Sequence, residues 1–275
     1  MSELVTISIE AGVADVRLNR PDKYNALSPE MFSAIIEAGE RLGAAKEVRA
    51  VVISGNGAGF CAGLDMASMR GLGGGQSSGS GAGGGNGGGL LRRDTEHPDN
   101  HAQRPALVWK RVGVPVIAAV HGVAYGGGMQ IALGADIRIA SPDAKMSVME
   151  IKWGLIPDMG ISQSLRDLVP LDVAKELTWT GRVMSGTEAK ELGLVTYVDA
   201  DPLARALSIA REIAGKNPDA IRRGKALLEQ SWRALPREGL ELEARLQMEL
   251  IGSANQAEAV KANFEKRAPN FKDPV

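Results

Sequence analysis

The sequence predicts an α/β protein. Two apolar, β-branched runs, residues 48–54 and 114–120, are typical of strands buried on both faces, and a glycine turn follows each of them. From Pro202 onward the pattern is helical. Because strands that alternate with helices indicate α/β architecture, we expect a core over residues 1–200 and a helical region over residues 201–275.

The first predicted elements are a hairpin and a helix. Residues 4–9 and 13–18 alternate apolar and polar side chains on either side of an Ala-Gly pair, which indicates antiparallel strands. Ser28 precedes a proline and a glutamate, so it is expected to cap the N-terminus of a helix over residues 29–46.

Later elements follow from helical periodicity, capping residues and terminal glycines. We predict helices over residues 129–133, 171–180, 185–193, 202–215, 218–234, 237–252 and 255–266, and strands over residues 135–140 and 194–198. In the helical region, Leu240, Leu246, Leu250 and Ile251 lie on roughly one face, which indicates either packing on the core or a subunit interface.

Bulk properties exclude several classes of protein. A net charge of −1 over 275 residues gives no field that attracts nucleic acid or an acidic membrane. The sequence has no apolar run long enough to span a bilayer, and its first residues lack the pattern of a signal peptide. One cysteine, Cys61, allows no internal disulfide, and no residue spacing indicates a metal site. A cytoplasmic protein is expected.

Residues 71–89 are almost wholly Gly, Ser, Ala and Asn, a composition that behaves as a flexible coil. The formal GxGxxG at residues 79–84 follows no strand and opens no helix, so it does not indicate a dinucleotide site. Either a surface loop or a flap over a pocket is compatible with this segment.

The glycine turns are the strongest functional signal. Gly126, Gly127 and Gly128 precede a helix, whose first N–H groups have no partner within the helix. A second glycine turn follows the strand over residues 48–54. Two such turns can bring two backbone N–H groups to one point, which is the geometry of an oxyanion hole.

The two turns carry a resemblance to a known family. The segments Phe60-Cys-Ala-Gly-Leu-Asp65 and Ala124-Tyr-Gly-Gly-Gly-Met-Gln130 resemble the crotonase superfamily of enoyl-CoA hydratases and isomerases. Further matches occur in family order at residues 19–27, 135–140, 150–157 and 185–195. The resemblance implies a spiral of ββα turns, an acyl-CoA thioester as substrate, no cofactor beyond the CoA of that substrate, and a homotrimer or dimer of trimers.

The same resemblance assigns the catalytic roles. It places the oxyanion-hole donors at the N–H groups of Leu64 and Gly127, where they would stabilise the enolate of the thioester. Hydratases of the family hold one water with two glutamates, and the corresponding residues here are Gln130 and Glu150. Gln130 can position a water, but an amide cannot exchange a proton at neutral pH.

Two alternatives to hydration follow from these residues. Some isomerases of the family use a single glutamate at the Glu150 position, and dienoyl-CoA isomerases use a further carboxylate at the position of Asp158. Asp158 is equally compatible with the N-cap of a helix that begins at residue 159. A non-catalytic acyl-CoA-binding protein is the remaining possibility.

Further binding residues are predicted from the resemblance and from residue type. An adaptable acyl pocket is expected because methionines flank the catalytic positions, namely Met66, Met69, Met129, Met149 and Met159. The oxyanion turn adds Ala62 and Asp65 to the predicted substrate contacts. The CoA phosphates and adenine are assigned to Arg20, Lys23, Phe264 and Lys266, with Arg267 and Phe271 as further candidates.

Overall fold

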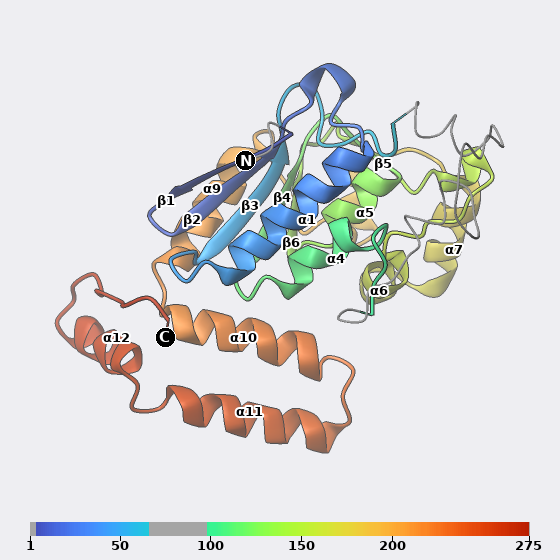
Figure 1. Ribbon diagram of the computed structural model, residues 1–275. Helices are drawn as coiled ribbons and strands as arrows, with labels where there is room; N and C mark the ends of the chain where they lie inside the picture. The colour runs from blue at the N-terminus through green and yellow to red at the C-terminus, as the bar shows by residue number, and fades with distance from the viewer. Residues whose placement is uncertain (1–3, 66–97, 275) are drawn as a thin grey trace, which may run out of the picture.

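The computed structural model describes residues 4–65 and 98–274 (Figure 1). Its strands are β1 (Val5–Glu10), β2 (Val13–Leu18), β3 (Ala50–Gly55), β4 (Val116–Val120), β5 (Val123–Tyr125), β6 (Ile137–Ala140), β7 (Lys145–Ser147), β8 (Met184–Ser185) and β9 (Tyr197–Val198). Its α-helices are α1 (Pro29–Ala44), α4 (Arg104–Arg111), α5 (Gly127–Leu133), α6 (Ile161–Ser164), α7 (Leu171–Thr180), α8 (Gly186–Glu191), α9 (Pro202–Ala214), α10 (Pro218–Ser231), α11 (Pro236–Leu250) and α12 (Ala254–Phe264). Short 3₁₀ turns are η1 (Pro21–Lys23), η2 (Glu150–Trp153) and η3 (Leu165–Asp167).

The predicted N-terminal hairpin and capped helix are confirmed. β1 and β2 pair antiparallel around Ala11 and Gly12, which both have positive φ, as a tight two-residue hairpin turn requires. The Ser28 side chain accepts a hydrogen bond from the backbone N–H of Met31 at the start of α1.

From β4 to β7, successive strands alternate between two sheets, as the predicted spiral requires. The main sheet has the order β1-β2-β3-β4-β6-β9 and is parallel from β2 onward. β5, β7 and β8 form the second sheet. Because β5 follows β4 directly and leads into α5, it places the three-glycine turn at the carboxyl end of the main sheet.

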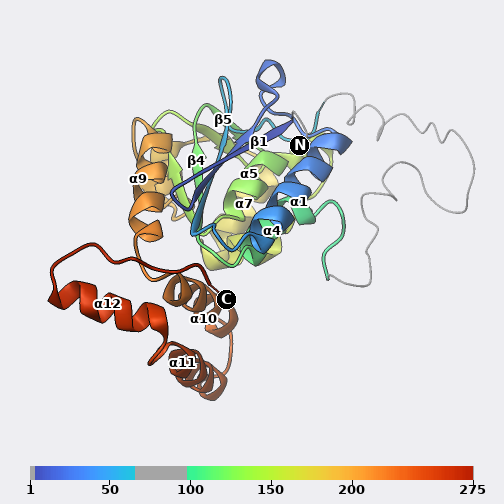
Figure 2. The same cartoon turned by 60° about the vertical axis from the view of Figure 1, so that its left-hand side comes forward.

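The main sheet is covered on both faces, so β3 and β4 are wholly buried. Alternate side chains of β3, such as Val51 and Ile53, face one side of the sheet and belong to the larger hydrophobic core, together with residues of α1, α4 and α5. Val52 and Ile117 point the other way and pack against α9. Figure 2 shows these helices on opposite sides of the strands.

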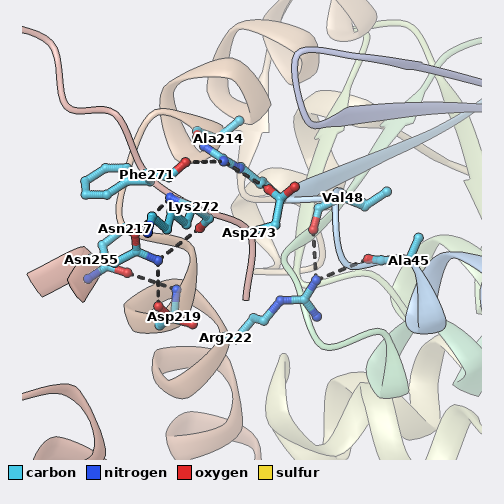
Figure 3. Close-up of polar contacts among 11 residues, drawn as sticks. Ala45, Val48, Ala214, Asn217, Asp219, Arg222, Asn255, Phe271, Lys272 and Asp273 are labelled. Atoms are coloured by element: carbon cyan, nitrogen blue, oxygen red, sulfur yellow. Dashed lines mark hydrogen bonds and ion pairs between the residues drawn. The ribbon is translucent and has the colours of Figure 1, made fainter. Parts of the chain in front are cut away.

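The last three helices, α10, α11 and α12, form an arm below the body that contains the main sheet (Figures 1 and 2). The helical region predicted from residue 201 is present, but its first helix, α9, belongs to the body. The arm is attached by polar contacts: Arg222 of α10 donates to the carbonyl oxygens of Ala45 (3.3 Å) and Val48 (3.0 Å). Figure 3 shows these bonds beside the network that ties the final residues to the arm.

Local differences from the predictions occur where the sequence lacks a strong periodic signal. Helix α4 and the three-residue strands β5 and β7 were not predicted. Among residues 4–65 and 98–274, no helix combines the length and the apolar character needed to cross a bilayer. Residues 71–89, together with Met66 and Met69, lie outside the described residues.

Candidate active site

A cavity of about 810 Å³ opens at the carboxyl end of the main sheet. Ten of the predicted site residues line it, contributed by η1 and its N-cap, by the turn after β3, by the start of α5 and by the segment from Met149 to α6. They are Arg20, Lys23, Ala62, Leu64, Asp65, Gly127, Met149, Glu150, Asp158 and Met159.

Hydrogen bonds of Gly63 and Asp65 with Leu27 determine the direction in which the N–H of the intervening residue, Leu64, points. The Leu27 N–H donates to the Gly63 carbonyl (2.8 Å), and the Asp65 N–H donates to the Leu27 carbonyl (3.1 Å). In an extended segment, alternate residues present their N–H groups to opposite sides. The Leu64 N–H therefore faces away from Leu27, and no residue in the described ranges accepts a hydrogen bond from it.

The first residue of α5, Gly127, supplies a second free N–H, as the first turn of any helix does. The two turns are in contact, because a Cβ atom on Gly63 would lie 3.4 Å from the Gly127 nitrogen and 2.6 Å from the Tyr125 carbonyl oxygen. Two donors without acceptors within the described residues thus lie in neighbouring turns at the pocket wall.

The three-glycine turn is needed for close approach. Gly126 has φ +51°, which L side chains rarely adopt, and a Cβ there would lie 3.3 Å from the Glu150 carboxylate. On Gly127 a Cβ would meet the Met159 sulfur at 2.7 Å, and on Gly128 it would meet the Cys61 carbonyl oxygen at 2.2 Å. A larger residue at position 128 would therefore separate α5 from the first turn.

Glu150 and Gln130 form a direct pair. Gln130 is buried, and its Nε2 donates to Oε1 of Glu150 at 2.6 Å. Its Oε1 accepts the backbone N–H of Met159 at 2.8 Å. Sequence reasoning gave Gln130 the task of positioning a water, whereas in the structure both ends of the amide are engaged by protein groups. Oε2 of Glu150 has no hydrogen-bond partner within the described residues.

The environment shifts both carboxyl groups in the same direction. Burial raises the pKa of Glu150, and the negative charge of Asp158 adds to the increase, while hydrogen bonds from backbone and Gln130 oppose it. Desolvation likewise raises the pKa of Asp158. The alternative role of Asp158 as a helix cap is wrong, because α6 begins at Ile161 behind Gly160 and has no side-chain cap.

The predicted substrate contacts divide into two groups. Met149 and Met159 line the cavity, whereas Met129 is fully buried in the core and does not line it. Asp65 lines the cavity with its carboxylate paired to Arg20, which donates to it at 3.0 Å and also to the carbonyl oxygen of Ala26. This ion pair links the η1 loop to the oxyanion turn.

The residues predicted to contact CoA lie in two different parts of the structure. Arg20 and Lys23 lie at the cavity, while Phe264 ends α12 with 85% of its surface exposed and Lys266 follows it. Neither Phe264 nor Lys266 lines the cavity of its own chain, because the arm is attached at the opposite, amino-terminal edge of the sheet. Arg267 is paired with Glu258.

Sequence reasoning missed several cavity residues, because nothing in their local pattern marks them as functional. These are Phe32, Tyr125, Lys152, Trp153, Leu155 and Ile156. Burial raises the pKa of the Cys61 thiol to about 12, so the thiol stays protonated at neutral pH and is not a nucleophile. The described parts of the chain contain no cluster of three His, Cys, Asp or Glu side chains suited to a metal ion.

Comparison with known proteins agrees with this geometry. The model of the enoyl-CoA hydratase/isomerase family matches residues 8–274. A peroxisomal Δ(3,5)-Δ(2,4)-dienoyl-CoA isomerase of Arabidopsis thaliana is 34% identical over 98% of this chain and 96% of its own length. An enoyl-CoA hydratase of Mycobacterium tuberculosis is 32% identical over 94% of this chain and 92% of its own.

The fold is similar over the same length. The crystal structure of an enoyl-CoA hydratase from Bacillus anthracis superposes with a TM-score of 0.86 and 28% identity, covering 98% of this chain and 99% of the other. Since both the sequence and the fold match over the full length, the chain belongs to the enoyl-CoA hydratase/isomerase family.

Proposed function

We propose that the protein converts an enoyl-CoA thioester through an enolate, with Glu150 as the group that carries the proton. The observation that carries the proposal is that Glu150 lines the same cavity as Leu64 and Gly127. Within the described residues, Oε2 of Glu150 has no hydrogen-bond partner and the N–H groups of Leu64 and Gly127 have no acceptor. These are the parts that enolate chemistry requires: a base, and donors for the developing negative charge on the thioester oxygen.

The chemistry follows from these roles. Glu150 removes a proton from the carbon next to the thioester carbonyl, and the electron pair moves onto the oxygen held by Leu64 and Gly127. Return of the proton at the far end of the allylic system gives the isomerised enoyl-CoA. Addition of water requires a second group that donates a proton while the first one accepts, and the amide of Gln130 cannot do so. We therefore place isomerisation ahead of hydration.

A second candidate function is dienoyl-CoA isomerisation with Glu150 and Asp158. The specific observation in its favour is that both carboxyl groups line one cavity and that the charge of Asp158 raises the pKa of Glu150. Two carboxyl groups of different pKa can act as base and acid at the two ends of a longer conjugated system.

We also propose a homotrimer or dimer of trimers, formed through the arm and located in the cytoplasm. Large apolar side chains are exposed on the arm, as expected for an interface, among them Trp232, Leu235, Met248 and Ile251. In such an assembly Phe264 and Lys266 of one copy would contact the CoA bound to another, since they do not line the cavity of their own chain.

Turnover of three substrates side by side tests the proposal: crotonyl-CoA, a 3-enoyl-CoA and a 3,5-dienoyl-CoA. We expect the 3-enoyl-CoA to be isomerised faster than crotonyl-CoA is hydrated, and the Glu150→Gln variant to be inactive on all three. Preferred turnover of the dienoyl-CoA, lost in Asp158→Asn, would favour the second candidate. Binding of acyl-CoA without any turnover would identify a non-catalytic protein.

A further inference from the structure

The hydrogen bonds of Gln130 fix which way round its amide lies. The Met159 backbone N–H is only a donor, so the group that faces it at 2.8 Å has to be the Gln130 oxygen. The amide nitrogen then faces Glu150, to whose Oε1 it donates at 2.6 Å. Because Gln130 is only 1% exposed, water does not compete for either bond.

This arrangement makes the two oxygens of Glu150 unequal. Oε1 accepts the amide N–H whether the carboxyl group is ionised or neutral, so it does not carry the proton. Its neighbour on the other side is Gly126, where a Cβ would lie 3.3 Å away. Oε2 is buried without a partner within the described residues, which leaves it as the oxygen that binds and releases a proton.

We propose that Gln130 is a positioning residue: its amide, anchored on the Met159 N–H, reserves Oε1 of Glu150 as an acceptor and confines proton transfer to Oε2. This inference rests on the proposed function and deepens it. A proton taken up and returned by one oxygen stays on one face of the substrate, as isomerisation by a single base requires. A water held between two carboxylates has no place here, since the second carboxylate is replaced by this anchored amide.

The test compares wild type with Gln130→Met, Gln130→Glu and a control, Gln163→Met. Met removes both hydrogen bonds, whereas Glu keeps an acceptor for Met159 and removes only the donor to Glu150. Gln163 is an exposed residue of α6 whose amide has one hydrogen-bond partner among the described residues, Ser162. Each protein is measured by the pH profile of 3-enoyl-CoA isomerisation and by ¹³C NMR titration of its glutamate carboxyl groups.

Loss of the donor removes a bond that favours ionised Glu150. We therefore expect its titration and the acidic limb of kcat/KM to move upward by roughly one to two pH units in Gln130→Met, and at least as far in Gln130→Glu. KM should change little, and Gln163→Met should match wild type. The other titratable side chains of the cavity are identical in all four proteins, so they do not account for a difference; they are Arg20, Asp22, Lys23, Tyr24, Asp65, Tyr125, Lys152 and Asp158.

An unchanged titration of Glu150 in folded Gln130→Met would overturn the proposal. If that variant does not fold, the side-chain amide signals of Gln130 in wild type decide: a hydrogen bond to Glu150 makes one Nε2 proton follow the Glu150 titration, and an amide signal that does not follow it would overturn the proposal. Should wild type isomerise no enoyl-CoA, the proposed function fails, but the NMR titration still tests the pairing of Gln130 with Glu150. An upward shift would then support the positioning role without the reaction.

Discussion

Glu150 is half-buried, and of its two carboxylate oxygens Oε1 accepts a hydrogen bond from Gln130. These two features predict the effect of replacing it with glutamine. Glu150→Gln keeps the shape and can still accept the Gln130 N–H, but it cannot carry a proton. We expect turnover to fall roughly 100- to 10,000-fold. Binding of acyl-CoA, measured by calorimetry, should persist because the oxyanion donors are backbone groups. A variant that turns over near the wild-type rate would remove Glu150 from the mechanism.

The same substitution makes a prediction about stability and pH. Since burial raises the pKa of Glu150 in the folded state, the folded protein binds more protons than the unfolded one between the two pKa values. Stability therefore falls as the pH rises through the raised pKa. We expect Glu150→Gln to have a higher Tm than wild type at pH 7, and the difference to vanish below about pH 4, near the pKa of an ordinary glutamate. Differential scanning calorimetry across this range checks the sign.

Steric contacts prevent any other residue from replacing Gly128. In Gly128→Ala the new Cβ would lie 2.2 Å from the Cys61 carbonyl oxygen, so α5 has to move away from the oxyanion turn. We expect a loss of roughly 100-fold or more in turnover, as for removal of one oxyanion donor, and about 1–3 kcal/mol of stability.

Gly43→Ala in α1 is the matched control for this substitution, because a Cβ there meets nothing within 4 Å. Alanine in place of a helical glycine should stabilise the protein by roughly 0.5–1 kcal/mol and leave turnover unchanged. Equal activity of the two alanine variants would show that the close contact of Gly128 is not needed for catalysis.

At the scale of elements, α10 is attached to the body by cations that bind the amino-terminal edge of the sheet. Lys225 donates to Asp136 (2.8 Å) and to the carbonyl oxygens of Trp109 and Val114, while its side chain is 8% exposed. Little apolar surface is buried here, because Pro218 is the only fully buried residue of α10. These polar bonds therefore fix the arm more than hydrophobic packing does.

Removal of the Lys225 charge tests this attachment. Lys225→Met leaves Asp136 without its cation, and loss of one partner of a buried pair costs roughly 3–5 kcal/mol. Because the Val116 N–H still donates to Asp136, we expect the lower end, about 3 kcal/mol, by urea unfolding at fixed protein concentration. Lys216→Met is the control: its 3.9 Å pair with Glu212 is exposed and should contribute under 1 kcal/mol. Equal costs for the two variants would contradict the role of Lys225.

At the scale of the whole molecule, the cavity lies at the carboxyl ends of the main-sheet strands, and the arm is attached at their amino ends. The predicted apolar face of the helical region is only partly used within the chain: Leu246 is buried, whereas Leu240 and Ile251 are 63% and 66% exposed. Exposed apolar surface of this kind favours association with another copy.

Charges introduced on this surface should separate the copies. We expect the double variant Met248→Glu, Ile251→Glu to be monomeric by light scattering, with wild type trimeric or larger. Glu243→Gln, on an exposed position of α11, should leave the assembly intact. A monomeric wild type would disprove the proposed oligomer, and an unchanged assembly of the double variant would place the interface elsewhere.

The sequence by itself determined what depends on neighbours along the chain. Alternation defined the hairpin, unbroken apolar runs defined β3 and β4, and capping residues such as Ser28 marked helix starts, because each reports a local period or a local hydrogen bond. The glycine turns were found the same way. Their roles came from the family resemblance and stay predictions; within the described residues, the N–H groups of Leu64 and Gly127 have no acceptor.

The tertiary structure alone decided how distant groups meet. The Gln130 amide bonds to Glu150 and Met159, which lie 20 and 29 positions further along the chain. Gln130 was expected to position a water, and these two bonds instead make it a partner of Glu150. Met129 faces the core and Asp158 caps no helix, although spacing placed both beside catalytic residues. Such contacts depend on which distant segments pack together, and on which buried donors and acceptors must find a protein partner because water is excluded. The local pattern of the sequence encodes neither.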